Sequence, residues 1–306
     1  MELLVFGCNG QVGWELQRAL APFGKVTALR REDPRGLCGD LAQPKGLAST
    51  VRQMAPDVII NAAAYTGVDD AESDPAQAST INAIAPRVLA DEAKSIGAWL
   101  IHYSTDYVFD GSGDRPWRES DLTGPLNVYG QTKLDGERAI QESGCRHLIF
   151  RTSWVYAPRG RNFLRTMLRL SAERDSLQVI DDQHGAPTSA ELIADTTAVA
   201  LRQCLAREQD GGLYHLTAAG ETTWFNYARH VIRSARAAGW PVKVADDAIH
   251  PVSSNAFPTA AKRPRNSRLD TRRLESTFGF QMPDWRIGVD RAVEEMVACE
   301  AERRDA

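Results

Sequence analysis

Short hydrophobic runs alternate with longer amphipathic stretches along the first half of the chain. The runs predict β-strands at residues 3–6, 26–29, 57–61, 98–104 and 147–151. The stretches between them predict helices at about 11–21, 44–54, 75–96 and 128–143. Nearly continuous apolar strands separated by helices form a parallel sheet that is covered on both faces. We therefore expect an α/β fold with a doubly wound parallel (Rossmann) sheet, whose ligands bind at the carboxyl ends of the strands.

The regular alternation ends near residue 155. A further strand is predicted at 177–180 and a further helix at 190–206, so we expect the chain to return to the sheet over about 176–206. The remaining part is irregular and contains several prolines. We expect a dinucleotide-binding domain over 1–155 and a smaller C-terminal cap, mainly a substrate-binding domain, over 156–306.

A glycine-rich loop, FGCNGQVGWEL, joins the first predicted strand to the first predicted helix and contains Gly7, Gly10 and Gly13. Glycine permits the tight turn and lets the backbone approach a pyrophosphate, which binds at the positive N-terminus of the helix. The spacing is G-x-x-G-x-x-G, whereas classical dehydrogenases have G-x-G-x-x-G. An ordinary strand–helix turn is the alternative, but the position of the loop favours a dinucleotide site.

The residue that selects between cofactors should lie at the end of the second strand, where an acid favours NAD. The sequence there is LRREDP, in which Arg30 and Arg31 precede Glu32 and Asp33. A guanidinium group can hold a 2′-phosphate through two parallel hydrogen bonds. We expect NADPH to be preferred and NADH to be usable, unless the arginines form only a solvated charged turn.

The overall composition restricts the classes of partner. Hydrophobic residues make up 43% of the chain and charged residues 25%, the net charge is -4 and the pI is near 5.9. A mildly acidic chain without an apolar run of ~20 residues gives no reason to expect nucleic acid or a membrane as partner. The five cysteines are scattered and form no C-x-x-C motif, and the six histidines do not show the spacing of a zinc site. This pattern indicates a reducing compartment, and we expect a cytoplasmic protein.

Tyr129 and Lys133 stand four residues apart in VYGQTKLDGE, within a predicted helix. Residues at i and i+4 share a helix face, so the lysine ammonium would lie beside the phenol and favour its ionised form. Thr105 and Asp106, in HYSTDYVFDG, follow a predicted strand on the same rim, where a hydroxyl could grip a substrate oxygen. Alone, such a Tyr–Lys pair is most often exposed on an ordinary helix.

In this order, the glycine loop, Thr105 and the Tyr129–Lys133 pair resemble the extended short-chain dehydrogenases/reductases. A narrower resemblance, to the dTDP-4-dehydrorhamnose reductase family, is carried by GQVGWELQRAL, NAAAYTGVDDAE, IHYSTDYVFDG, PLNVYGQTKLDGE, FRTSWVYA, QHGAPTSAEL and KRPRNSRLDT. Together these segments run through nearly the whole chain, which makes the resemblance specific although each segment alone would be weak.

The resemblance implies reduction of the 4-keto group of dTDP-4-dehydro-6-deoxy-L-mannose to dTDP-L-rhamnose by NAD(P)H, the last step of dTDP-rhamnose synthesis. It implies that Tyr129 donates the proton and that Thr105 holds the substrate oxygen. It also implies that Lys133 lowers the pKa of the Tyr129 phenol and contacts the nicotinamide ribose. It also assigns cofactor contacts, beside those of the glycine loop and Arg30, to Gln11, Val12, Asp40, Leu41, Ala63, Ala64 and Tyr65.

For the dTDP-sugar substrate, the resemblance implies contacts from Thr105, Asp106, Trp154, Arg263 and Asn266. We expect the basic segment 262–268 to help hold the diphosphate, although a solvated loop is an equally good interpretation. In this family Mg²⁺ sometimes bridges a homodimer, through acids that match Glu15, Glu191 and Glu295. Tyr65 departs from the family pattern, in which histidine is frequent, and its bulk could shift the cofactor contacts.

Other interpretations stay open. A 4,6-dehydratase of the same fold would need an acid after Thr105 and Asp106, where this chain has Tyr107. Another sugar-nucleotide reductase or a 4-epimerase shares the fold, but the wider set of motifs does not resemble an epimerase. A non-catalytic regulatory subunit that binds a sugar nucleotide or NADP would be expected to have lost Tyr129 or Lys133, and this chain keeps both.

Overall fold

A computed structural model describes residues 1–207 and 211–305, and side chains up to residue 300. Its centre is a six-stranded sheet in the order β2-β1-β3-β4-β5-β10, in which every neighbouring pair is parallel. The strands are β1 (Glu2–Phe6), β2 (Lys25–Leu29), β3 (Val58–Asn61), β4 (Trp99–Thr105), β5 (Arg146–Thr152) and β10 (Gly212–His215). The doubly wound parallel fold is confirmed, and the first five strands begin and end within one residue of their predicted bounds.

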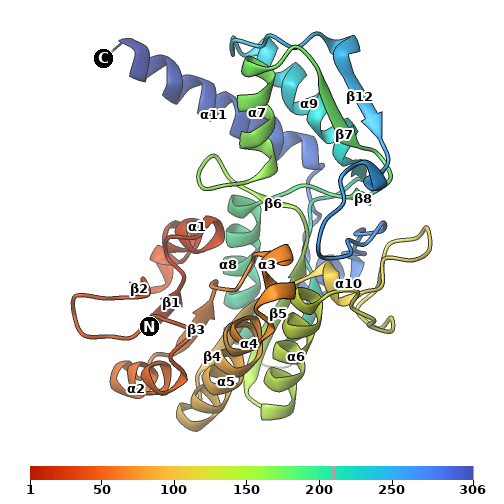
Figure 1. The fold of residues 1–306 in the computed structure, drawn as a ribbon. Coiled ribbons are helices and arrows are strands. Elements are labelled where there is room, and N and C mark those ends of the chain that lie inside the picture. The colour runs from red at the N-terminus through yellow and green to blue at the C-terminus, as the bar shows by residue number, and fades with distance from the viewer. Residues whose placement is uncertain (208–210, 306) are drawn as a thin grey trace.

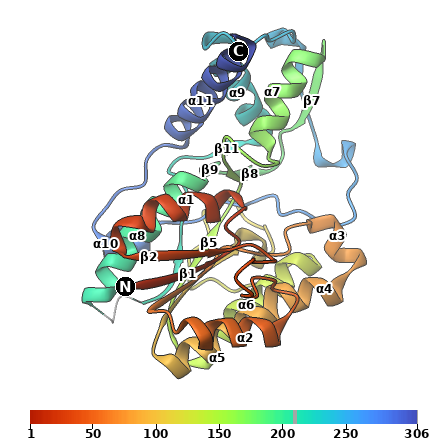
Figure 2. The same cartoon turned by 90° about the vertical axis from the view of Figure 1, so that its left-hand side faces the viewer.

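Helices cover both faces of this sheet, as Figure 2 shows. One face carries α1 (Gln11–Leu20) and α8 (Ala190–Ala206), and the other carries α2 (Pro44–Met54), α5 (Ala85–Ile96) and α6 (Val128–Ser143). Within β1, Leu3 and Val5 enter the core on the first face, whereas Leu4 and Phe6 enter the core on the second. Because successive residues enter different cores, the strands are hydrophobic throughout.

The predicted helix at 75–96 is one continuous rod made of three pieces. These are α4 (Pro75–Ser79), a π-helical turn (Thr80–Ile84) and α5, and the short α3 (Val68–Ser73) precedes them. A π-helical turn accommodates an extra residue within a helix and is frequent at functional sites. Here the π-helical turn packs against α6.

A second part of the molecule lies above the sheet in Figure 1. It contains α7 (Phe163–Glu173), α9 (Trp224–Ala237), α11 (Trp285–Asp305), β7 (Leu177–Ile180) and β12 (Ile249–Val252). These elements enclose a hydrophobic core of their own, around residues such as Leu168, Tyr227 and Val289. That this part binds the substrate, and that the boundary lies at residue 155, stay predictions.

One predicted return to the sheet is wrong. The strand at 177–180 is β7, and it pairs with β12 in the second part of the molecule. Its residues alternate, with Leu177 and Val179 buried and Gln178 exposed, whereas a central strand needs both faces buried. The chain returns instead through α8, as expected, and through β10, which the sequence did not predict.

The remaining elements are short. They are the strand pairs β6 (Val155–Tyr156) with β9 (Thr188–Ser189) and β8 (His184–Gly185) with β11 (Thr222–Thr223), the helix α10 (Arg272–Phe278), and 3₁₀ turns at Ala21–Phe23, Asp106–Val108, Asp246–Ala248 and Ser254–Ala256. Among the described residues, no helix combines the length and the apolar character needed to cross a bilayer.

Candidate active site

Helix α6 approaches two backbone segments so closely that glycine is required at each contact. A Cβ atom on Gly130 would lie 2.2 Å from the Tyr107 carbonyl oxygen, and one on Gly136 would lie 2.1 Å from the Asn82 carbonyl oxygen. The start of the helix is fixed by Asn127, whose side-chain oxygen accepts a hydrogen bond from Gly130 N. The first turn of α6 is therefore held against the segment that follows β4.

Tyr129 lies in this first turn, beside Thr105 at the end of β4. Its ring also meets the ring of Tyr107 edge-on, with centroids 5.7 Å apart. Burial raises the pKa of Tyr129 to about 12, and a hydrogen bond with Thr105 opposes this only in part. The phenol therefore keeps its proton at neutral pH, which is the form that a proton donor needs.

Asp106 places a buried carboxyl group next to this pair. Its Oδ1 accepts a hydrogen bond from Thr105 Oγ1 at 3.1 Å. Ser267 also forms a side-chain hydrogen bond with this carboxyl group. Burial raises the pKa of Asp106 to about 7, so this group exchanges its proton near neutrality.

Lys133 lies one turn further along α6, but its amine turns toward β4. Its Nζ donates to the Tyr103 carbonyl oxygen at 2.5 Å and lies 3.2 Å from His102 Nε2. The pKa of Tyr129 was expected to fall towards neutrality beside Lys133, but in this structure burial dominates and the pKa is raised instead. Burial also lowers the pKa of Lys133 itself to about 8, and Glu137 opposes that change.

A buried ion pair, which the sequence analysis missed, joins α6 to the sheet. Arg151 of β5 donates from Nε to Glu137 Oε1 at 2.9 Å and from Nη2 to Glu137 Oε2 at 2.6 Å. The two side chains are only 5% and 1% exposed. Removing one member would leave the other charge buried and unpaired, which is strongly destabilising. The available signal was that Glu137 follows Tyr129 and Lys133 at further helical spacing.

Asn82, in the π-helical turn, is another residue that the sequence analysis missed. Its Oδ1 accepts a hydrogen bond from Tyr65 N at 2.9 Å, and its Nδ2 donates to the Tyr65 carbonyl oxygen at 3.1 Å. The same Nδ2 contacts Thr132 Oγ1 of α6 at 3.2 Å. Asn82 therefore fixes the backbone of the loop after β3 relative to the helix that carries Tyr129.

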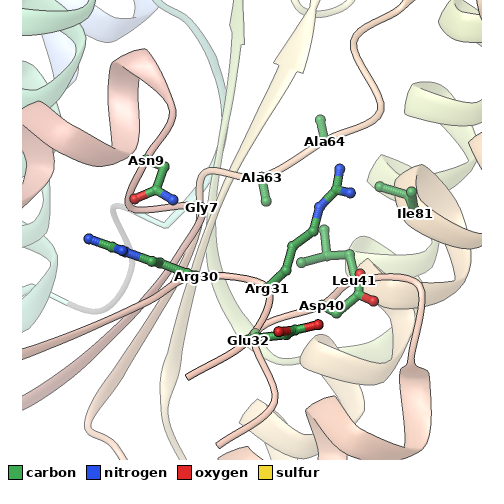
Figure 3. A pocket seen from close by; sticks show the side chains of 11 residues that line it. Gly7, Asn9, Arg30, Arg31, Glu32, Asp40, Leu41, Ala63, Ala64 and Ile81 are labelled. Carbon is green, nitrogen blue, oxygen red and sulfur yellow. The ribbon is translucent and has the colours of Figure 1, made fainter. Parts of the chain in front are cut away.

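A cavity of about 460 Å³ opens at the carboxyl ends of β1, β2 and β3 (Figure 3). It is lined by the predicted cofactor residues Gly7, Arg30, Asp40, Leu41, Ala63 and Ala64, and also by Asn9, Arg31, Glu32, Gly39 and Ile81. The glycine loop makes the turn beside it, since Gly7 has a φ of +84° and a Cβ on Gly13 would lie 2.1 Å from the Gly7 carbonyl oxygen. The small lining residues Ala63 and Ala64 and the guanidinium groups of Arg30 and Arg31 fit the adenosine half of a dinucleotide phosphate.

The other predicted cofactor residues lie close by. Gly10, Gln11, Val12 and Gly13 form the cap and first turn of α1, where backbone N–H groups are available to a phosphate. The side chain of Gln11 has a structural partner, because its Oε1 accepts a hydrogen bond from Asn162 Nδ2 at 2.7 Å. Tyr65 does not line the cavity described above; its backbone is held by Asn82.

Arg30 and Arg31 extend from the end of β2 in different directions at this cavity (Figure 3). Asp33 forms an ion pair with Arg35 at 2.7 Å, and the charge of Arg30 acts on it as well. This contact lowers the pKa of Asp33 to about 2. Within the segment 30–33, Glu32 is thus the acid that lines the cavity and would lie near a bound 2′-phosphate.

A larger cavity, of about 690 Å³, lies between the segment after β4 and the loop over residues 254–265. Lys262, Arg263 and Arg265 line it, as a site for a diphosphate requires. Arg263 also pairs with Asp69 of α3, with Nη2 and Oδ2 2.6 Å apart. Three of the four basic residues in the segment 262–268 therefore line one cavity, and the fourth is Arg268.

Asn266 and Arg268, in contrast, do not line this cavity. Asn266 is 2% exposed, and its Nδ2 donates to the carbonyl oxygens of Ser112 and Arg115. Its Oδ1 accepts from Arg268, which also pairs with Glu221 at 3.1 Å. The polar groups of both residues brace the loop in this structure, and a direct substrate contact of either residue stays a prediction.

Trp154 follows β5 and has a left-handed backbone, with φ of 48°. A bulky residue adopts this conformation only where its surroundings hold it there, which is frequent at binding sites. Its indole stacks on Trp224 with ring centroids 3.7 Å apart. Gly185 provides the space, since a Cβ there would lie 2.7 Å from the indole. That Trp154 faces the sugar stays a prediction.

The three acids predicted to bind Mg²⁺ do not form a metal site within one chain. Over the described ranges, no group of three or more possible metal ligands comes together. Glu15 and Glu191 are neighbours, because Arg18 lies 3.4 Å from the first and 3.9 Å from the second. A site that includes Glu295 would need a second subunit, and it stays a prediction.

Comparison with known proteins agrees with this geometry. The family model described as "RmlD substrate binding domain" matches residues 1–298. The chain belongs to this family. Among its relatives, the dTDP-4-dehydrorhamnose reductase of Escherichia coli (strain K12) is 54% identical over 296 residues, which cover 97% of this chain and 98% of that protein.

Solved structures of the same family share the fold. A dTDP-4-dehydrorhamnose reductase from Clostridium acetobutylicum has a TM-score of 0.84 at 34% identity, covering 98% of this chain and 100% of that one. One from Bacillus anthracis, determined in complex with NADP, has a TM-score of 0.84 at 33% identity, covering 96% and 99%. The family resemblance inferred from the sequence motifs is therefore confirmed.

Proposed function

We propose that this chain reduces the 4-keto group of dTDP-4-dehydro-6-deoxy-L-mannose to give dTDP-L-rhamnose, with NADPH as reductant. The observation that carries the proposal is the half-buried, protonated Tyr129, which lies with the buried Thr105 and Asp106 at the carboxyl end of β4. A phenol in this state is a suitable general acid for a ketone oxygen. Relatives named for this reaction, similar over nearly the full chain, support the same assignment.

The bound nicotinamide would supply the hydride that adds to the ketone carbon. Tyr129 then donates its proton to the ketone oxygen as negative charge develops there. Thr105 hydrogen-bonds the phenol and orients it, and Asp106, which accepts a hydrogen bond from Thr105 Oγ1, would contact the sugar beside it. Lys133, when protonated, stabilises the phenolate that remains, and each turnover consumes one proton that the site regains from solvent.

NADPH, rather than NADH, is the cofactor that the cavity favours. Arg30 and Arg31 both line the end of the cleft at which the 2′-position of the ribose should lie. With Asp33 occupied by Arg35, Glu32 is the remaining acid of the segment that opposes the phosphate. The preference should therefore be real but incomplete.

The diphosphate of the substrate would lie against Lys262, Arg263 and Arg265 in the larger cavity. A homodimer joined by Mg²⁺ through Glu15, Glu191 and Glu295 also belongs to the proposal, supported by the proximity of Glu15 and Glu191 on neighbouring helices. The metal would have a structural role there, so its removal by a chelator should change the oligomeric state measured by light scattering. The cytoplasm is the proposed location, because the five cysteines are scattered along the sequence without a C-x-x-C motif.

The test is an assay with purified protein, in which the 4-keto sugar nucleotide is supplied with NADPH and the loss of NADPH absorbance is followed. The sugar product is then identified by NMR. Stoichiometric formation of dTDP-L-rhamnose is expected. Binding of both ligands without turnover would instead indicate a non-catalytic subunit.

A further inference from the structure

Asn61, His102 and Lys133 form a buried line of side chains from β3 through β4 to α6. None of them is more than 2% exposed. Asn61 Nδ2 lies 3.2 Å from His102 Nδ1, and His102 Nε2 lies 3.2 Å from Lys133 Nζ. Burial holds the pKa of His102 well below its usual range. The imidazole is therefore neutral, and only one of its nitrogens carries a hydrogen.

The orientation of the Asn61 amide determines the direction of every hydrogen bond in this line. Ala63 N donates to Asn61 Oδ1 at 3.2 Å, which identifies the amide oxygen and leaves the Nδ2 donor facing His102. His102 Nδ1 must then accept, so the ring hydrogen lies on Nε2. Nε2 in turn donates to Lys133 Nζ, which can accept a hydrogen bond only as a neutral amine.

The opposite arrangement leaves two donors facing each other. If Lys133 were an ammonium donating to Nε2, the ring hydrogen would lie on Nδ1 and would point at the Asn61 amino group. Neither group can reach water there, so both would lose a hydrogen bond. The hydrogen bonds of this line therefore favour the neutral amine of Lys133, and they lower its pKa in the same direction as burial does.

We propose that Asn61 and His102 are positioning residues, which present a donated N–H to the Lys133 amine and so set how readily this lysine releases its proton. The catalytic consequence rests on the proposed function. A lysine that exchanges its proton near the working pH can return a proton to the Tyr129 phenolate after each turnover, whereas an ordinary lysine holds it.

The other charged and titratable groups around Lys133 do not favour its neutral form, so we assign this effect to Asn61 and His102. From α6 itself come Tyr129, which is protonated, and Glu137, which opposes release of the lysine proton. The charge of Glu137 is compensated by Arg151 of β5. From β4 come the neutral imidazole and the Tyr103 carbonyl oxygen, which accepts from the amine in either protonation state.

The test is the titration of Lys133 in the cofactor-free enzyme, followed by NMR on isotope-labelled lysine Cε. Single substitutions can assign every signal, because the lysines of this chain are Lys25, Lys45, Lys94, Lys133, Lys243 and Lys262. The wild-type midpoint is expected near pH 8. His102→Phe should raise it by ~1 pH unit, a tenfold change in proton affinity, because the donated hydrogen bond is lost.

The matched control is His102→Gln, whose amide can accept from Asn61 and donate to Lys133, and it should keep the wild-type midpoint. An unchanged midpoint in His102→Phe, or an equal rise in His102→Gln, overturns the proposal. Should the phenylalanine variant not fold, His102→Asn replaces it with the same expected rise, because that amide is too short to reach Lys133.

A second readout is the pH profile of kcat/KM, whose alkaline limb should move upward together with the NMR midpoint. A purely structural role would lower activity at all pH values and leave the limb in place. Because the NMR titration uses neither substrate nor cofactor, a lack of reductase activity would refute the proposed function without deciding this test.

Discussion

The catalytic end and the adenosine end of the proposed cofactor site differ in how far their charged groups are exposed to water. At the catalytic end, Asp106 and Lys133 are each 2% exposed, and burial changes both of their pKa values strongly. At the adenosine end, Arg30 and Arg31 are exposed. Electrostatic interactions are strong in a buried site and are weakened by solvent and salt at an exposed one. The effect of a substitution should therefore fall from the first end to the second.

Tyr129→Phe should give the largest effect. Turnover is expected to fall by a factor on the order of 10²–10⁴, the usual scale for a general acid, while the Kd for NADPH stays nearly unchanged. The matched control is Tyr103→Phe, which also removes a phenol hydroxyl but only one that contacts Thr197 on the other face of β4. Near-normal turnover in Tyr129→Phe would show that another group donates the proton.

Asp106 should give the clearest pH effect at the buried end. Its pKa is raised from 3.8 to about 7 in the folded protein, so the folded state binds a proton that the unfolded state has released. The stabilisation is complete below about pH 4 and is lost as the pH rises through 7. The difference in the free energy of unfolding between wild type and Asp106→Asn should change by up to ~1.4 kcal/mol per pH unit in this window.

Urea denaturation at a series of pH values measures this difference. Other groups, such as the neutral buried His102 and His215, contribute equally to both proteins and cancel. Parallel stability curves for the two proteins would mean that Asp106 is ionised throughout, contrary to its burial.

Arg263→Ala tests a residue of intermediate burial, which lines the larger cavity. The KM for the sugar nucleotide should rise by roughly 10–100-fold, because a hydrogen bond to a charged group is worth ~1.5–3 kcal/mol, and the KM for NADPH should not change. Arg268→Ala is the control from the same segment, since Arg268 faces Glu221 instead of the cavity. Equal effects of the two variants would argue against a substrate contact specific to Arg263.

The double substitution Arg30→Ala, Arg31→Ala should give the smallest effect. The preference for NADPH over NADH in kcat/KM should be on the order of tenfold in the wild type, because an exposed charged contact is worth ~1–2 kcal/mol. The double variant should lose most of it, and added salt should reduce it in the wild type. Arg52→Ala, on the neighbouring helix α2 and paired with Glu92 away from the cavity, should leave the preference intact. A wild type that prefers NADH would assign both arginines to a solvated turn.

The sequence predicted those features that depend on neighbours in the chain. The first five strands, the glycine loop and the i, i+4 spacing of Tyr129 and Lys133 are local patterns, and the structure reproduces them. The partners of Lys133 could not be predicted in this way. His102 and Glu137 reach it from a strand and from a later turn of the helix, and which way the amine turns is decided by packing.

The C-terminal half shows the same limit. The strand β7 has a good strand pattern, but the pattern does not say with which sheet a strand will pair. Likewise, the basic segment 262–268 is evident from its composition, yet only the fold shows that Asn266 turns inward while Arg263 and Arg265 line the cavity. Asn82 was hidden because the hydrophobic pattern predicts a helix over 75–96 without indicating the π-helical turn that orients this side chain.

The most direct test of the reductase proposal is an isotope transfer experiment. NADPH that carries deuterium at the transferable position of its nicotinamide is incubated with the enzyme and the 4-keto sugar nucleotide, and the product is examined by NMR. The proposal predicts that the deuterium is found at C4 of the sugar, in stoichiometric amount, and that Tyr129→Phe slows its transfer strongly without redirecting it. Product without deuterium at C4, or no transfer by a protein that binds both ligands, would contradict the proposal.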